Sequence, residues 1–200
     1  MKTGAYRFVQ TLAAAGMFIA PFAMGAPAGA PPPQQAAMCG GCHGAHGQGA
    51  VRGVPRLAGQ NADYMSHALA MFKDGTRAST VMQPIASTLD AAQVRQLTDY
   101  YSTQSAPLAD TRPAPPELAR AGRQLAAGCF SCHGSQGQGD GARHPRIAGQ
   151  PSQFIIDRLH EFQARARGKA PDPGSMTAIA AGLTEEQIKD AATYLSRLEP

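Results

Sequence analysis

The sequence predicts an all-α protein built from two copies of one helical unit. Three observations predict this class. Residues 39–100 recur as residues 129–194, so the chain is a tandem duplication. Hydrophobic residues near the end of each copy follow the spacing of a helix that buries one face. No stretch alternates apolar and polar residues in the way that a half-buried strand does.

The composition excludes several classes of protein. The charged share of 16% is too low for a coiled coil, and the hydrophobic share of 43% is too high for a disordered chain. Lys and Arg total 18 against 14 Asp and Glu, and this small excess forms no long basic stripe. We therefore expect no nucleic-acid partner. The four cysteines form two widely separated pairs, which does not fit a disulfide-stapled scaffold.

Residues 1–25 are interpreted as a secretory signal peptide. Lys2 and Arg7 precede an uncharged, mostly apolar stretch that ends in small residues suited to cleavage before Ala26. The alternative is a transmembrane anchor. The shortness of the stretch, the presence of Pro21 and the lack of a following basic cluster disfavour that alternative. The chain is therefore expected to be exported.

The rest of the chain divides into two short domains. The two copies match at an offset of 90 residues through residues 55–60 (PRLAGQ) and 145–150 (PRIAGQ). Farther on the offset is 94, because the second copy carries an insertion around residues 169–174. A Pro-rich, polar stretch separates the copies and has the composition of a linker. We expect the first domain at residues 26–108, the linker at 109–116 and the second domain at 117–200.

Two helices are expected in each copy from start and stop signals. The middle helix is expected at residues 61–73 and 151–167, ended by a glycine in both copies. The last helix begins behind Asp90 in the first copy and behind Thr184 in the second, each with Gln three residues later as in a capping box. The apolar residues that follow share one helix face: Val94, Leu97 and Tyr101, and Ile188, Ala191, Ala192, Leu195 and Leu198.

A further helix is expected before the second cysteine pair. Pro116 suits the first turn of a helix that runs through residues 117–127 and ends at Gly128, just before Cys129. The equivalent stretch before Cys39 is rich in Pro and Gly. The corresponding helix is therefore expected to be short or absent in the first copy.

Each copy carries the motif Cys-x-x-Cys-His-Gly, which predicts covalent haem attachment. Two residues between the thiols place both sulfur atoms on one side of a helical turn, where they can add to the two vinyl groups of one porphyrin. The histidine that follows then lies under the ring, where its imidazole can ligate the iron. The sequence therefore predicts two covalently attached haem c groups, on Cys39, Cys42 and His43 and on Cys129, Cys132 and His133.

Other uses of a Cys-x-x-Cys pair fit less well. A thioredoxin-like redox pair is expected beside a βαβ pattern, which the sequence lacks. The two pairs together could hold zinc, but zinc sites place their cysteine pairs far closer than 90 residues apart. A disulfide within each pair is expected only transiently, during export.

The repeat also predicts the sixth iron ligand. Met82 and Met176 correspond to one another, and the Ile and Ala that follow them recur as well. Both are expected in extended, turn-rich sequence just before the last helix. Met65 and Met71, on the middle helix, are expected to fill the core instead. The competing ligand type is histidine, but His46, His67, His144 and His160 align with other residue types, and of these His46 and His144 are the ones that could lie near a haem edge.

These ligands predict an electron carrier and not an enzyme. Histidine and methionine fill the two positions of each iron that the porphyrin leaves, so all six are occupied, substrate cannot bind to the iron and electron transfer is favoured. A dihaem peroxidase-like enzyme is a less favoured alternative, because it needs an open position on one iron. A second alternative is an electron-accepting dihaem subunit of a larger dehydrogenase or oxidase complex, whose local sequence would look the same.

The chain resembles dihaem class I c-type cytochromes, most closely the cytochrome c4 family. The resemblance covers about residues 36–200 and rests on the haem motif, the PR(L/I)AGQ segment, residues 75–77 (GTR) and the Met-x-x-Ile-Ala stretch before a Tyr-bearing last helix. It implies two tandem cytochrome c-type domains, packed pseudo-symmetrically with their haem edges facing. The resemblance also implies a periplasmic electron carrier. The partners expected on this basis are redox proteins such as a terminal oxidase or a membrane-bound quinol oxidoreductase, met by transient docking. The weak first helix and Pro84 depart from the family pattern, so the first haem site is expected to be more exposed.

Overall fold

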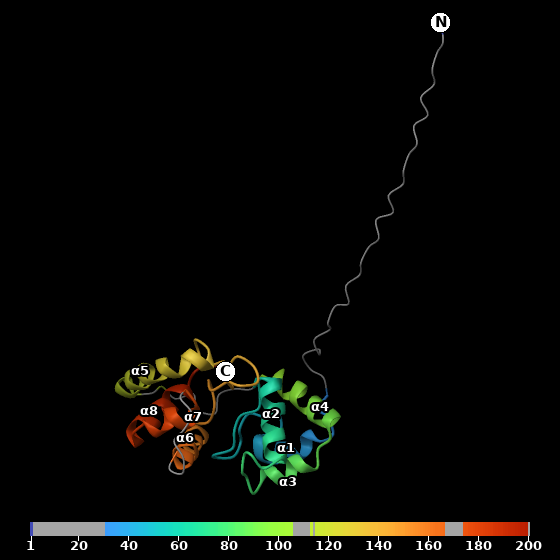
Figure 1. Cartoon of the computed structure of the whole chain (residues 1–200), viewed down its shortest axis with the longest axis horizontal. Helices are drawn as coiled ribbons and strands as arrows, with labels where there is room; N and C mark the ends of the chain where they lie inside the picture. The colour runs from blue at the N-terminus through green and yellow to red at the C-terminus, as the bar shows by residue number, and fades with distance from the viewer. Residues whose placement is uncertain (2–30, 106–112, 114, 167–173, 200) are drawn as a thin grey trace.

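The helices form two groups that follow the sequence repeat. The computed structural model describes residues 1, 31–105, 113, 115–166 and 174–199. Within these ranges the regular elements are all α-helices, with α1–α4 gathered on one side and α5–α8 on the other (Figure 1). The predicted all-α class is therefore confirmed. Residues 2–25 of the expected signal peptide, most of the expected linker and residues 169–173 of the insertion lie outside the described residues.

The first group contains α1 (Ala36–His43), α2 (Ala62–Lys73), α3 (Met82–Ser87) and α4 (Ala91–Ser102). The expected capping box at the start of α4 is confirmed. The Asp90 carboxylate accepts the backbone N–H groups of Ala92 and Gln93, and the Gln93 side chain accepts the N–H of Asp90. The first helix, α1, is short, as the Pro- and Gly-rich sequence before it predicts.

The second group contains α5 (Pro116–His133), α6 (Ser152–Ala166), α7 (Met176–Ala181) and α8 (Glu185–Leu195). The expected end of α5 at Gly128 is wrong, because the helix continues to His133. Glycine keeps both backbone hydrogen-bonding groups, so it lowers helix stability by only about 1 kcal/mol relative to alanine. The haem motif of the second copy is therefore the last part of a long helix.

Short helices occupy the positions expected to be extended. Met82 is the first residue of α3 and Met176 is the first residue of α7. Serine hydroxyls stabilise both helix starts: Ser79 Oγ accepts the N–H of Met82, and Ser175 Oγ accepts the N–H of Ala178. The expectation of extended backbone at the two methionines is therefore wrong.

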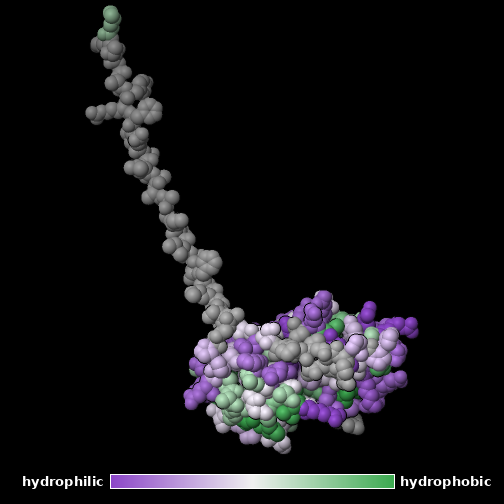
Figure 2. All heavy atoms as spheres, turned by 180° about the vertical axis from the view of Figure 1, so that it is seen from behind, coloured by the Kyte–Doolittle hydropathy of each residue, from purple (hydrophilic) through white to green (hydrophobic). Residues whose placement is uncertain are grey.

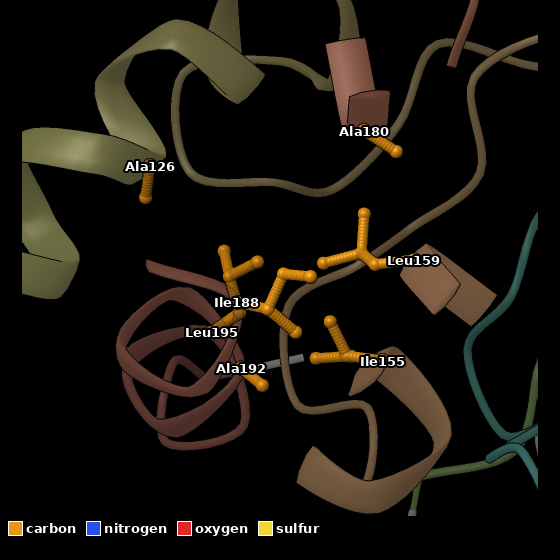
Figure 3. Close-up of a cluster of buried hydrophobic side chains, with 7 residues drawn as sticks. All are labelled: Ala126, Ile155, Leu159, Ala180, Ile188, Ala192 and Leu195. Carbon is orange, nitrogen blue, oxygen red and sulfur yellow. The ribbon is translucent and has the colours of Figure 1, made fainter. Parts of the chain in front are cut away.

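Each group of helices encloses its own hydrophobic core. In the second group the core lies between α5, α6, α7 and α8, where Ile188, Ala192 and Leu195 of α8 lie opposite Ala126 of α5 (Figure 3). In the first group the buried residues come from α1, α2, α4 and the turn before α4: Ala36, Met65, Leu89, Leu97, Tyr100 and Tyr101. The predicted apolar faces of α4 and α8 therefore face these cores. No helix in the described ranges combines the length and the hydrophobicity that a membrane crossing requires.

Gly122 of α5 lies where this helix packs most closely on α8. A Cβ atom on Gly122 would lie 2.5 Å from the Cβ of Tyr194 and 2.6 Å from the carbonyl oxygen of Asp190. We expect Gly122→Ala to lower the free energy of unfolding of the second domain by about 1–3 kcal/mol, because the α8 backbone has to shift. Thermal unfolding followed by circular dichroism measures this loss.

Gly128 provides the matched control on the same helix. A Cβ atom there meets nothing within 4 Å, so Gly128→Ala is expected to be neutral or stabilising by up to about 1 kcal/mol. Equal unfolding temperatures for the two variants would contradict the close contact between α5 and α8.

Candidate functional site

The cysteine pairs lie on the last turns of helices. In the first half, Cys39 and Cys42 belong to α1, which ends at His43, and the second pair has the same arrangement at the end of α5. Residues three positions apart are neighbours on a helix surface, so the two thiols of each pair lie on one side of the turn. In both pairs the first thiol is half-buried, the second is exposed, and neither pair forms a disulfide. Burial raises the pKa of Cys39 and of Cys129, so these thiols stay protonated near neutral pH.

Both motif histidines are buried and hydrogen-bonded in the same way. The Nδ1 atom of His43 lies 2.9 Å from the carbonyl oxygen of Pro55, and that of His133 lies 2.9 Å from the carbonyl oxygen of Pro145. A carbonyl oxygen can only accept, so Nδ1 carries the proton and Nε2 carries the lone pair in the neutral ring. Burial lowers the pKa of both imidazoles, and this favours the neutral form. Each ring therefore offers one nitrogen for binding a metal.

The loop after each histidine positions the proline carbonyl. Gly44, the residue after the end of α1, has a φ of 86°, a conformation that glycine adopts without strain. The carbonyl of Gly47 then accepts the backbone N–H groups of Leu57 and Ala58 and folds the loop back under the histidine. The second copy repeats these bonds at the equivalent residues. The repeated sequence therefore produces a repeated hydrogen-bond network around each imidazole.

The predicted sixth ligands occupy equivalent positions in the two halves. Met82 and Met176 are both half-buried at the first residue of a short helix. Met176 packs against the second core, as does Phe130 of the haem motif. Met65 is buried within the first core, as expected for a core-filling residue. Ligation of iron by Met82 and Met176 stays a prediction.

The second motif histidine has a neighbour that the first lacks. The ring centroid of His144 lies 5.9 Å from that of His133, and its Nδ1 lies 2.8 Å from the Asp140 carboxylate. The equivalent positions in the first copy hold Ala50 and Val54. The Asp140–His144 pair therefore makes the surroundings of the two motif histidines chemically different.

Two glutamines from the PR(L/I)AGQ segments join the halves. Gln150 accepts the backbone N–H of Arg56 at 3.0 Å and donates to the Arg56 carbonyl at 2.9 Å. Gln60 makes the reciprocal pair with Arg146, at 2.8 and 2.9 Å. The four bonds form two equivalent pairs, so the two halves meet around an approximate two-fold axis. Sequence reasoning used the segment only to mark the repeat and missed its role at the junction, although a polar residue retained in both copies was a usable signal.

Buried arginine side chains test whether haem fits the site. The Nε atoms of Arg77 and Arg146 are buried and have no hydrogen-bond partner among the described residues. Arg56 is also buried, and this burial, together with the nearby positive charge of Arg146, lowers the pKa of its guanidinium. Buried N–H groups need acceptors, and neighbouring buried cations need anions. The carboxylates that a haem carries supply both, so the residues present fit the group.

Comparison with known proteins agrees with this site. The family model for cytochrome c matches twice, at residues 34–105 and 119–199. Cytochrome c-552 of Acidithiobacillus ferridurans is 37% identical, with 80% of this chain and 73% of the relative covered. A thiosulfate dehydrogenase electron acceptor of Thiomonas intermedia is 35% identical, with 82% of this chain and 80% of the relative covered.

A solved structure shows the same architecture. The structure of Acidithiobacillus ferrooxidans cytochrome c4 is 34% identical and superposes with a TM-score of 0.70, covering 81% of this chain and 99% of that one. The predicted pair of cytochrome c-type domains is thereby confirmed. Two covalently attached haem c groups and exchange of electrons with redox partners follow from the same matches. The chain belongs to the cytochrome c family, as a dihaem electron carrier of the cytochrome c4 group.

Proposed function

We propose that each domain holds its haem through two thioether bonds and ligates the iron with one histidine and one methionine. In the first domain, residues 26–108, these residues are Cys39, Cys42, His43 and Met82. In the second domain, residues 117–200, they are Cys129, Cys132, His133 and Met176. The observation that carries this proposal is the hydrogen bond of each imidazole Nδ1–H to a proline carbonyl, which leaves the Nε2 lone pair for the metal.

These ligands make the protein a carrier and not an enzyme. A haem held by these residues would supply one-electron redox chemistry, and a methionine sulfur ligand would raise its reduction potential. If histidine and methionine both ligated the iron, no coordination position would stay open for a substrate. The hydrogen bond to Pro55 or Pro145 holds each imidazole in one orientation, so little rearrangement accompanies electron transfer.

We place the mature protein in the periplasm, after removal of residues 1–25. The basic and then apolar pattern at the start of the chain supports export. The partners that we propose are a membrane-bound quinol oxidoreductase as donor and a terminal oxidase as acceptor, each bound transiently.

The surface of the first half supports transient docking. Met38, Val51 and Val81 of this half are large hydrophobic side chains that are each about half exposed, whereas the second half has only Ile179, at 40%, among its described residues. Figure 2 shows hydrophobic residues gathered on its surface, whereas polar residues dominate the visible surface of the second half. A small exposed hydrophobic area suits the weak, short-lived complexes of electron carriers.

The relative from Thiomonas intermedia favours a second candidate function. That protein is named as the electron acceptor of thiosulfate dehydrogenase and matches this chain over both domains. On this alternative, the present protein is the electron-accepting subunit of a dehydrogenase and stays bound to it.

Reduction of the purified holoprotein by two donors distinguishes these candidates. The intact mass of protein from a periplasmic fraction is expected to correspond to a chain beginning at Ala26 with two haem groups. A quinol oxidoreductase preparation supplied with quinol is then expected to reduce both haems. Gel filtration of the mixture is expected to show no stable complex between the two proteins. Reduction by thiosulfate dehydrogenase alone, with co-elution of the two proteins, would favour the subunit function.

A further inference from the structure

One peptide group connects the first motif histidine to the opposite half of the molecule. The carbonyl of Pro55 and the N–H of Arg56 belong to the same peptide unit. Its carbonyl accepts the Nδ1–H of His43 at 2.9 Å, and its N–H donates to the side-chain oxygen of Gln150 at 3.0 Å. A side chain of the second half is therefore two hydrogen bonds away from the proposed iron ligand of the first half.

The same arrangement occurs in the reverse direction. The peptide unit between Pro145 and Arg146 accepts from His133 at 2.9 Å and donates to the side-chain oxygen of Gln60 at 2.8 Å. Each glutamine also donates its amide N–H to the carbonyl of the arginine it bonds, so it is held at two points. Each histidine is thus linked to a glutamine of the other domain.

Burial makes these hydrogen bonds strong enough to polarise the peptide groups that they join. Gln60 is 4% exposed and Gln150 is 2% exposed, so bulk water does not compete for the peptide groups. Hydrogen bonds in a chain polarise one another, with a strengthening of roughly 10–30% per bond. An acceptor on the peptide N–H therefore makes the carbonyl of the same peptide a better acceptor for the imidazole.

A stronger acceptor on Nδ1–H makes the imidazole more electron-rich at Nε2. A more basic imidazole stabilises ferric iron relative to ferrous iron, and this lowers the reduction potential. The hydrogen bond from the glutamine would therefore act on the iron through the peptide and the histidine.

We propose that Gln150 of the second domain tunes the reduction potential of the first haem, and that Gln60 of the first domain tunes that of the second. This inference rests on the proposed ligation by His43 and His133. Both glutamines are positioning residues, and each lies in the domain opposite to the iron that it influences. The contact between the two halves therefore adjusts both potentials, in addition to the effect of the methionine ligands.

Potentiometric titration of the holoprotein tests this crossed dependence. In Gln150→Leu the N–H of Arg56 loses its acceptor, so the potential of the first haem is expected to rise while that of the second stays unchanged. Gln60→Leu is expected to raise the potential of the second haem alone. Nuclear magnetic resonance assigns each titration to its haem. It also measures the chemical shift of the His43 Nδ1 proton. This resonance is expected to move upfield in Gln150→Leu as its hydrogen bond weakens.

Arg52→Ala is the matched control, because it removes a different hydrogen bond between the two halves. Arg52 donates to the side chain of Gln153 in the other half at 2.6 Å, but this bond does not involve either histidine-linked peptide. The variant is expected to leave both potentials and the His43 proton unchanged. If Gln150→Leu does not fold, the smaller Gln150→Ala removes the same acceptor and is titrated instead.

The outcomes separate this inference from the proposed ligation. A wild-type protein whose spectra lack histidine and methionine ligation would overturn the proposed function. Intact ligation with equal shifts of both potentials in Gln150→Leu, a shift of the second haem only, or no shift would overturn the crossed dependence. A rise confined to the first haem, with the second unchanged, supports it.

Discussion

Replacing Cys39 and Cys42 by alanine is expected to remove one of the two haem groups and to unfold the first domain. The variant cannot form the thioether bonds, so its haem is no longer held covalently. A domain of about 80 residues has a hydrophobic core of marginal size, and a large buried cofactor completes it. The buried cluster of the first half contains six residues: Ala36, Met65, Leu89, Leu97, Tyr100 and Tyr101. We expect so small a core to depend on the additional contact with the haem.

Mass measurement under denaturing conditions shows the loss directly. The wild-type chain is expected to carry two haem adducts and the variant one. The reciprocal variant, with Cys129 and Cys132 replaced by alanine, serves as the control and is expected to keep the adduct of the first domain. A wild-type chain without covalent adducts, or a Cys39→Ala, Cys42→Ala chain that keeps two, would contradict the haem attachment proposed for these residues.

Substituting Met176 by alanine is expected to lower the reduction potential of the second haem and to open its iron to small ligands. The variant lacks the sulfur ligand that stabilises ferrous iron. Carbon monoxide is expected to bind one haem of the reduced variant and neither haem of the wild type. The near-infrared absorption band of sulfur-ligated ferric haem is expected to fall to half its intensity, since the first haem keeps its ligand.

Met65→Ala is the control for the loss of a methionine side chain. Met65 is buried in the first core, so its truncation is expected to lower the free energy of unfolding by about 2–5 kcal/mol. Both potentials and the near-infrared band are expected to stay as in the wild type. Carbon monoxide binding in Met65→Ala, and its absence in Met176→Ala, would show that the repeat assigns the sixth ligand to the wrong methionine.

The sequence by itself determined the features that depend on residues close together in the chain. The capping boxes of α4 and α8 each link residues three positions apart, so Asp90 with Gln93 and Thr184 with Gln187 were readable as helix starts. The haem motif is likewise confined to six consecutive residues. The apolar faces of α4 and α8 follow from spacing within one helix, and the structure confirms them as the faces that meet the cores.

Local signals were misleading where packing between helices decides the backbone. Gly128 has the residue type of a helix end, yet α5 continues past it to His133. The contact of α5 with α8 and the haem motif at its end both favour an unbroken helix, and they outweigh the weak preference of one glycine. The short helices that begin at Met82 and Met176 were missed because six residues give too little periodicity to recognise.

Only the tertiary structure decided how one half acts on the other. Gln150 and Arg56 are 94 residues apart, and Gln60 and Arg146 are 86 apart, so no local pattern relates them. Their hydrogen bonds exist because two similar loops, each folded back under its own histidine, meet around an approximate two-fold axis. A buried amide in that position must pair with the backbone it faces, because an unpaired polar group away from water is costly. The sequence repeat predicts two similar sites, but only the packing of the two folded halves joins them through hydrogen bonds.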